Sequence, residues 1–168
     1  DRAARPTPSP IDHLIAVWLG KDDHPGLVSL LLGGLTAGTG VPELSDEVLA
    51  LIPRLLTHHE PDIVRLAARL AVQRQRKELA DHLIPLLRHV ELQVRVEAVT
   101  GLAALAPGRV LDQVLPLLRD PSDHVRRAVV ELCAQHLDRR AVPGLLELLK
   151  DPSVSEPAAK ALKAIEFY

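Results

Sequence analysis

Histidine and cysteine are the residue types here that could most readily do chemistry, because both bind transition metals and act in catalysis. Four histidines fall in expected turns along one edge of the fold: His58, His59, His89 and His124. Turns of adjacent stacked helix pairs lie about 10 Å apart, whereas zinc requires ligands at about 2 Å. We therefore expect these histidines to be exposed or to cap helices. Cys133 precedes His136 by one helical turn, and we expect it to be a core thiol.

Motifs for enzyme chemistry are missing from the sequence. No GxSxG, HExxH, P-loop or dinucleotide-binding glycine pattern occurs. Glycines between residues 33 and 40 resemble a phosphate loop only in composition, because they follow an expected helix and no Lys-Ser/Thr pair comes after them. The chain holds one Phe, one Tyr and one Trp, too few for an aromatic-walled pocket. We therefore expect a protein without enzyme activity, catalytic residues, cofactor or metal.

Charge distribution leaves one alternative open. The net charge is -2, yet residues 61–140 hold thirteen Arg and Lys against ten Asp and Glu. The basic residues of Arg74 to Lys77, Arg126 with Arg127, and Arg139 with Arg140 could contact nucleic-acid phosphates. Neighbouring acids such as Glu131 and Asp138 could equally pair with them on a solvated face. A nucleic-acid-binding or nucleic-acid-processing module that uses these mildly basic middle repeats therefore stays an alternative function.

Features of the chain ends and its apolar runs bear on location. No apolar run approaches the roughly 18 residues of a membrane span, and the start lacks a basic-then-apolar signal pattern. A single cysteine fits a reducing compartment. We expect a cytoplasmic protein with no membrane partner. Asp1 in place of Met, and an ending on Phe167 and Tyr168 without a polar cap, are typical of a piece of a longer protein.

A repeat must position whatever site the chain carries. The motif of an aliphatic residue, a proline and further leucines recurs with its prolines 32, 31 and 27 residues apart: Pro53, Pro85, Pro116 and Pro143. Each proline falls within an expected first helix, where it would kink the helix at the same place in every unit. We expect first helices near Ser45–His58, Lys77–Arg88, Gly108–Arg119 and Arg139–Lys150.

A second motif follows each of the first. It begins at Val64, Val94, Val125 and Val154, with apolar residues four and eight positions later on one helical face. We expect second helices near Pro61–Gln73, Leu92–Leu105, Ser122–His136 and Val154–Ile165. Because an isolated pair this short cannot bury its apolar face, the pairs must stack. The pattern predicts an all-α, right-handed α-solenoid of stacked antiparallel helix pairs.

The start of the chain follows this pattern poorly. We expect one domain over residues 1–168, with a disordered lead-in at 1–9, a degenerate helix pair at 10–44 and about four repeats at 45–168. Helices are predicted over Ile11–Leu19 and His24–Leu32, with Trp18 packed inward. Gly33 and Gly34 are predicted to begin a flexible connection.

The run from Asp138 to Pro152, following Val125-Arg126-Arg127-Ala128, resembles the HEAT-like repeat first noted in phycobilisome lyases. The resemblance extends over about residues 45–165 and implies a scaffold, adaptor or transport role more often than an enzyme. A lyase-type enzyme is the alternative that it leaves open. It also implies an inter-repeat ladder of loop acids and second-helix arginines, for which Asp120 and Arg126 match both positions, whereas Arg65 and Arg95 match the arginine alone.

The second helices are expected to line the concave face of the solenoid. Residues two and six positions after each motif valine should point away from the core. They pass from apolar to charged along the stack: Leu66, Leu70, Val96, Thr100, Arg127, Glu131, Glu156 and Lys160. We therefore predict a non-catalytic protein-binding scaffold or adaptor module whose concave face holds another protein or a peptide segment.

Overall fold

The computed structural model describes residues 16–17, 24–37, 44 and 46–166. Every regular element among these residues is a helix, which confirms the predicted all-α class. The chain separates into two compact units, residues 1–74 and 75–168. The organisation into a single domain over residues 1–168 stays a prediction.

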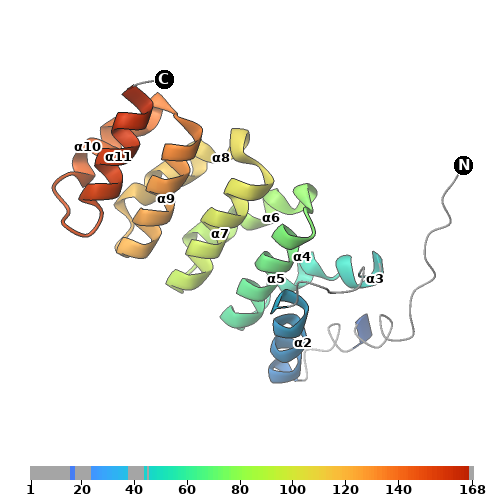
Figure 1. Cartoon of the computed structure of the whole chain (residues 1–168). Coiled ribbons are helices and arrows are strands. Elements are labelled where there is room, and N and C mark those ends of the chain that lie inside the picture. Colours follow the sequence, from blue (N-terminus) through green and yellow to red (C-terminus); the bar gives the residue numbers. More distant parts are fainter. Residues whose placement is uncertain (1–15, 18–23, 38–43, 45, 167–168) are drawn as a thin grey trace, which may run out of the picture. The chain divides into compact units, whose positions relative to one another are not determined.

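Residues 75–168 contain helix pairs joined by short turns (Figure 1). In the first pair, η1 (Lys77–Leu79), α6 (Ala80–Leu83) and η2 (Pro85–Arg88) precede α7 (Leu92–Leu105). In the second, α8 (Pro107–Val114) and η3 (Leu115–Arg119) precede α9 (Asp123–His136). In the third, η4 (Arg139–Ala141) and α10 (Val142–Leu148) precede α11 (Ser155–Glu166). The predicted bounds of these second helices differ from the observed ones by at most one residue.

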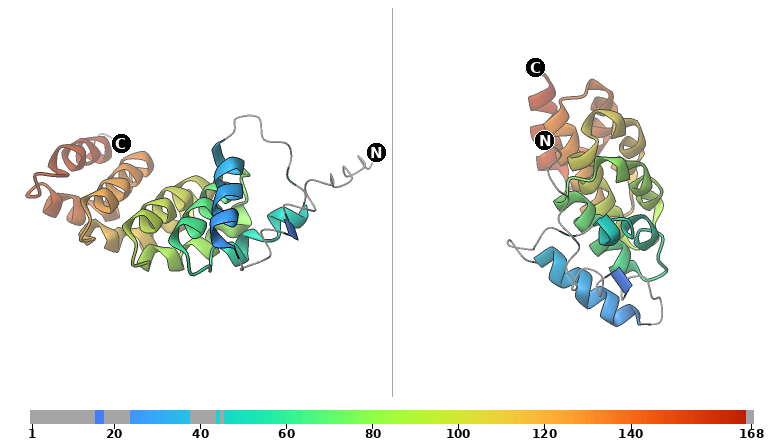
Figure 2. Two further views of the ribbon diagram at one scale, coloured as in Figure 1. Left: turned by 90° about the horizontal axis from the view of Figure 1, so that it is seen from below. Right: turned by 90° about the vertical axis from the view of Figure 1, so that its right-hand side faces the viewer.

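The second helices of this unit form one layer. Helix α9 packs against both α7 and α11, and α10 packs against η3 of the pair before it. The two rows of helices can be followed in Figures 1 and 2. Between the rows lies an aliphatic core that includes the motif residues Val94, Ala98, Leu102, Val125, Val129, Cys133, Val154 and Ala158. Stacking of this kind confirms the predicted solenoid, because each pair buries its apolar face against its neighbours.

The recurring prolines divide the first helices into short segments. Pro53 lies in the first turn of α4 (Ile52–Leu55), Pro85 begins η2, Pro116 lies in the first turn of η3, and Pro143 in that of α10. A proline in a first turn withholds an N–H that has no intrahelical partner. The predicted kink within a continuous helix is therefore a break between segments, and its cost is smaller than that of a mid-helix proline.

Residues 24–74 form the other described packing unit. It contains α2 (Pro25–Ala37), α3 (Asp46–Leu49), α4 and α5 (Pro61–Gln73). Helix α2 packs along α5 and buries Val28 and Leu32. The Gln73 side-chain Nε2 donates to the Thr36 carbonyl at 2.8 Å, which ties the C-terminal ends of the two helices together.

Helix α2 corrects one prediction from the sequence. Gly33 and Gly34 continue this helix to Ala37 and do not begin a flexible connection. Each glycine costs a helix about 1 kcal/mol relative to alanine, and burial of Val28 and Leu32 against α5 offsets this cost. The lead-in at 1–9, most of the predicted helix over Ile11–Leu19, and Trp18 lie outside the described residues.

Candidate functional site

The turn between the two helices of each pair repeats one hydrogen bond. Asp120 Oδ1 accepts from the Ser122 N–H at 2.8 Å, and Asp151 Oδ1 accepts from the Ser153 N–H at 3.0 Å. His89 Nδ1 takes the same place and accepts from the Glu91 N–H at 3.1 Å. A side chain that accepts from the N–H two residues later stabilises a tight turn before a helix.

His58 makes the equivalent contact in the unit of residues 1–74. Its Nδ1 accepts from the Glu60 N–H at 3.0 Å, just before α5 begins. His59 and His124 are exposed. The expectation of exposed or capping histidines is confirmed for the exposed His59 and His124, whereas His58 and His89 close the turn before a helix and make no N-cap hydrogen bond to it.

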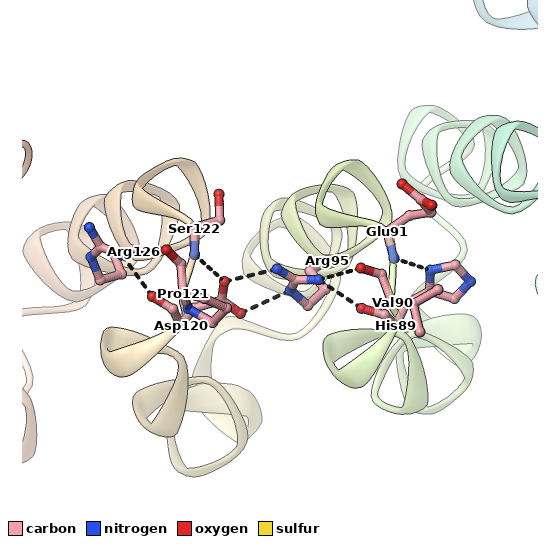
Figure 3. Close-up of polar contacts among 8 residues, drawn as sticks. All are labelled: His89, Val90, Glu91, Arg95, Asp120, Pro121, Ser122 and Arg126. Carbon is pink, nitrogen blue, oxygen red and sulfur yellow. Dashed lines mark hydrogen bonds and ion pairs between the residues drawn. The ribbon is translucent and has the colours of Figure 1, made fainter.

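Arg95 joins two adjacent repeats through all three of its guanidinium nitrogens (Figure 3). Its Nε and Nη2 donate to the two carboxylate oxygens of Asp120, each at 2.9 Å. Its Nη1 donates to the carbonyls of His89 at 2.8 Å and Val90 at 2.9 Å, in the turn of its own repeat. Among the described residues, Asp120 is the buried charged residue, 7% exposed. Such a two-pronged contact fixes both distance and orientation between the repeats.

Arg126 repeats this arrangement one pair further on. Its Nη1 donates to the carbonyls of Asp120 at 2.7 Å and Pro121 at 3.1 Å, as Figure 3 shows for Asp120. Its Nη2 lies 2.7 Å from Asp151 Oδ2 and donates to Ser153 Oγ at 3.2 Å. Arginine therefore contacts the backbone of its own turn and the acid of the next turn.

This geometry corrects the ladder expected from the sequence. Arg126 contacts Asp120 only at its backbone carbonyl. The Asp120 carboxylate forms its ion pair with Arg95 instead. Asp151 completes the ladder, although the sequence analysis did not place it among the ladder residues. The signal that could have revealed it is the shared Asp-Pro-Ser order of the two turns. Arg65 pairs with Asp62 in its own helix at 3.2 Å.

Further ion pairs join the first helices of the second and third repeats. Arg119 donates to both carboxylate oxygens of Glu147, at 2.9 and 2.7 Å, and Arg140 pairs with Asp112 and Asp138. Hydrogen bonds and charge from Arg119 hold the pKa of Glu147 below its ordinary value. The side-chain hydrogen bond from Arg140 does the same for the pKa of Asp138. The Arg119–Glu147 and Arg140–Asp112 pairs are exposed, so each adds little stability.

The predicted concave row divides into two parts. Thr100, Arg127, Glu131, Glu156 and Lys160 are exposed on α7, α9 and α11, and Val96 is half-buried on α7. Arg127 Nη2 donates to the Ser153 carbonyl at 2.7 Å, across the boundary between two repeats. Lys160 lies 2.7 Å from Glu156 Oε1 on the same helix. The charged members of the row therefore lie in one layer of adjacent helices.

Leu66 and Leu70 do not belong to an exposed surface. Leu66 is 7% exposed and Leu70 is fully buried, which contradicts the expectation that they point away from the core. The reason is that α2 packs along α5 and covers that side of the helix. The apolar half of the predicted binding row is therefore core of the unit of residues 1–74.

Comparison with known proteins identifies the repeat. A family model described as HEAT repeats matches residues 80–166. The chain belongs to the HEAT repeat family. A crystal structure of an engineered protein from the Northeast Structural Genomics Consortium has a TM-score of 0.67 at 19% sequence identity, over 94% of this chain and 80% of that one. At this identity the likeness concerns the fold alone. No curated protein matched the chain.

The residues that could bind a metal or undergo oxidation have structural positions in the HEAT repeats. Cys133 is a fully buried free thiol in α9, as predicted. Burial, with a smaller contribution from Asp138, raises the pKa of Cys133 to about 11, so the thiol keeps its proton at neutral pH. Within the described residues, no three His, Cys, Asp or Glu side chains are grouped to hold a metal ion. In the same part of the chain no helix has both the length and the apolar character needed to cross a membrane.

Proposed function

We propose that this HEAT repeat chain is a non-catalytic, protein-binding scaffold module that uses the outward face of α7, α9 and α11. HEAT repeats commonly mediate protein interactions, and their stacked second helices offer long continuous surfaces. The supporting observation is the row of exposed side chains on three adjacent helices, from Thr100, beside the half-buried Val96, to the charged residues of α9 and α11.

Contacts between adjacent repeats support a rigid surface. Arg95 and Arg126 clamp consecutive turns, and Arg127 joins α9 to the turn before α11. Binding costs less when the surface is already ordered, because fewer side chains lose freedom. A surface held by these clamps can therefore bind an extended or helical peptide segment with little rearrangement.

The order of apolar and charged residues along the face of α7, α9 and α11 indicates the kind of partner. Val96 and Thr100 offer methyl groups and one hydroxyl, whereas Arg127, Glu131 and Lys160 offer both signs of charge. We expect a segment with a small apolar anchor followed by residues of mixed charge. Exposed charges of this kind determine the register and the selectivity of binding more than its affinity.

A displayed library of random peptides tests this function. The full chain should enrich a peptide family, and the double variant Arg127→Glu, Lys160→Glu should lose binding to those peptides by about tenfold or more, because each reversal places like charges opposite the partner. The matched control is Gln113→Glu, an exposed change on α8 in the other row of helices. It should retain binding. Enrichment of nothing, or equal binding by both variants, would refute the proposed function.

The nucleic-acid alternative is separated by a second measurement. Several arginines on which it depends already pair with acidic side chains of the chain: Arg126 with Asp151, and Arg140 with Asp112 and Asp138. Fluorescence anisotropy with labelled single- and double-stranded DNA should therefore show no binding at low salt. Binding that weakens steeply as salt rises would favour the alternative, because phosphate contacts release counterions.

A further inference from the structure

The third HEAT repeat carries an open apolar groove. It has a volume of about 490 Å³ and lies between α10 and α11. Its lining residues are Arg139, Val142, Leu146, Leu162, Ile165 and Glu166. Leu146 is 52% exposed, and Leu149, one helical turn later, is 42% exposed. Exposed large aliphatic residues beside an apolar groove are typical of a surface that another apolar element covers.

In the preceding repeats, the leucines equivalent to Leu149 are covered by a neighbouring helix or are buried. Leu149 stands two residues before Asp151, as Leu118 stands before Asp120 and Leu87 before His89. Leu118 and Leu87 are only 3% and 4% exposed. For Leu118 the cover is α10 of the following repeat, which packs against η3. The groove beside Leu149 is therefore a stacking face like those inside the solenoid.

The contact that covers Leu118 defines what an occupant needs. A Cβ atom added at Gly144 in α10 would lie only 2.5 Å from Leu118 Cδ1. Glycine at this point lets the backbone of one helix approach the leucine of its neighbour. An occupant of the groove should therefore be an aliphatic helix with a glycine on the contacting side. The two charged lining residues, Arg139 and Glu166, have opposite signs, which suits a helix without net charge.

Helix α2 of the same chain has these properties. Its thirteen residues include no Asp, Glu, Lys or Arg. Leu27 and Leu30 are 45% and 71% exposed. Cβ atoms added at Gly33 and Gly34 would meet nothing within 4 Å, so this part of α2 is open to a close neighbour. A helix that is apolar all round is normally covered on more than one side.

We propose that α2 of a second copy of this chain docks in the groove between α10 and α11. Leu27 and Leu30 fill the groove, and the glycines of α2 receive Leu149 as Gly144 receives Leu118. The two surfaces differ, so the association is head-to-tail, and a pair of copies retains one free groove and one free α2. The proposal uses other residues than the peptide-binding face proposed above, although both surfaces include α11.

Sedimentation velocity of the full chain tests the association. The average mass should rise above the 18.3 kDa of one chain as concentration increases from micromolar toward about millimolar. A constant mass of one chain over this range would overturn the proposal, whether the groove is empty, binds a foreign protein, or is covered by α2 of its own chain.

Two variants then remove one surface each. The groove variant is Leu146→Glu with Leu149→Glu, and the helix variant is Leu27→Glu with Leu30→Glu. Each should weaken self-association by about tenfold or more, because it forces an unpaired carboxylate against apolar groups. The replaced leucines are partly exposed, so both variants should keep their helical circular dichroism. Val90→Glu, at an 87% exposed residue in a turn, is the matched control and should associate as the unmodified chain does.

Mixing the two variants distinguishes head-to-tail docking from other dimers. The helix variant keeps an intact groove, and the groove variant keeps an intact α2, so an equimolar mixture should form a one-to-one dimer with unmodified affinity and stop there. A self-complementary dimer made of two α2 helices, or of two grooves, would not be restored by mixing. Failure of the mixture to dimerise therefore overturns the proposal.

Discussion

Arg95 Nε and Nη2 each lie 2.9 Å from a carboxylate oxygen of Asp120, and the two residues come from different HEAT repeats. Their side chains are 12% and 4% exposed. The remaining contact of the Asp120 carboxylate goes to the Ser122 N–H, and the remaining Arg95 contacts go to turn carbonyls. One carboxylate therefore closes a turn and joins two repeats at once.

Removing this carboxylate should destabilise the fold. Asp120→Ala leaves the Arg95 guanidinium without its partner and the Ser122 N–H without an acceptor, and we expect a loss of about 3 kcal/mol in the free energy of unfolding. Urea titration followed by circular dichroism measures this loss. Asp112→Ala removes an exposed partner of Arg140 and should hardly move the unfolding midpoint. Equal effects of the two substitutions would show that the buried ladder contributes no more to the free energy of unfolding than an exposed ion pair.

The role of His89 as a turn acceptor can be separated from the packing of its ring. His89→Asn retains a side-chain acceptor for the Glu91 N–H and should keep stability nearly unchanged. His89→Ala removes the acceptor and should cost about 1 kcal/mol, in the range of a lost helix cap. Thermal unfolding of both variants measures the difference. If His89→Asn melts at as low a temperature as His89→Ala, the imidazole contributes through its packing and not as a hydrogen-bond acceptor.

The buried thiol of Cys133 predicts a specific pH dependence. Its folded pKa is about 11, above its unfolded value near 9, so the folded state holds its proton more tightly. Stability from this group is complete below about pH 8 and falls as pH rises from about 9 to 11, because the unfolded chain then releases the proton first. Urea titrations at a series of pH values measure the fall.

Cys133→Ser provides the comparison. This variant should be less stable, because a hydroxyl replaces an apolar thiol in the core, but it should lack the component of the alkaline decline that comes from the thiol. Native Cys133 should also react with a thiol reagent only as fast as the fold opens. Rapid labelling at neutral pH, with the fold intact, would contradict the buried position.

Backbone strain at Gln75 predicts a stabilising substitution. Gln75 is exposed and has a φ of 53°, in the left-handed region that favours glycine. Gln75→Gly should stabilise the chain by up to about 1 kcal/mol. Gln135→Gly replaces an equally exposed glutamine within α9 and should destabilise it by a similar amount. Thermal melts of both variants should therefore shift in opposite directions. Shifts of the same sign would show that Gln75 is not strained.

Helix positions were largely predictable from the sequence. Helices α5 and α7 begin and end at the predicted residues, Pro61–Gln73 and Leu92–Leu105. The reason is that an apolar spacing of four residues, bounded by turn signals, is a local property. The breaks before Pro85 and Pro116 were expected as kinks, because the sequence marks where a proline disrupts a helix but not how the backbone relaxes.

Partners of the ladder were less predictable. The sequence marks the arginine and acid positions, but spacing within one repeat suggested Asp120 with Arg126 and hid the pairs that join repeats. Arg95 meets Asp120, and Arg126 meets Asp151, because stacking brings each turn beside the second helix of the preceding repeat.

The sequence by itself determined the all-α repeat, the register of its second helices and the burial of Cys133, because periodic apolar residues specify which side of a helix faces the core. Tertiary structure alone decided that Leu66 and Leu70 are buried under α2, that Gly33 and Gly34 continue a helix, and which acid each arginine meets. These outcomes depend on contacts between segments far apart in the chain. The local sequence pattern contains no information about which distant segment packs against a given helix.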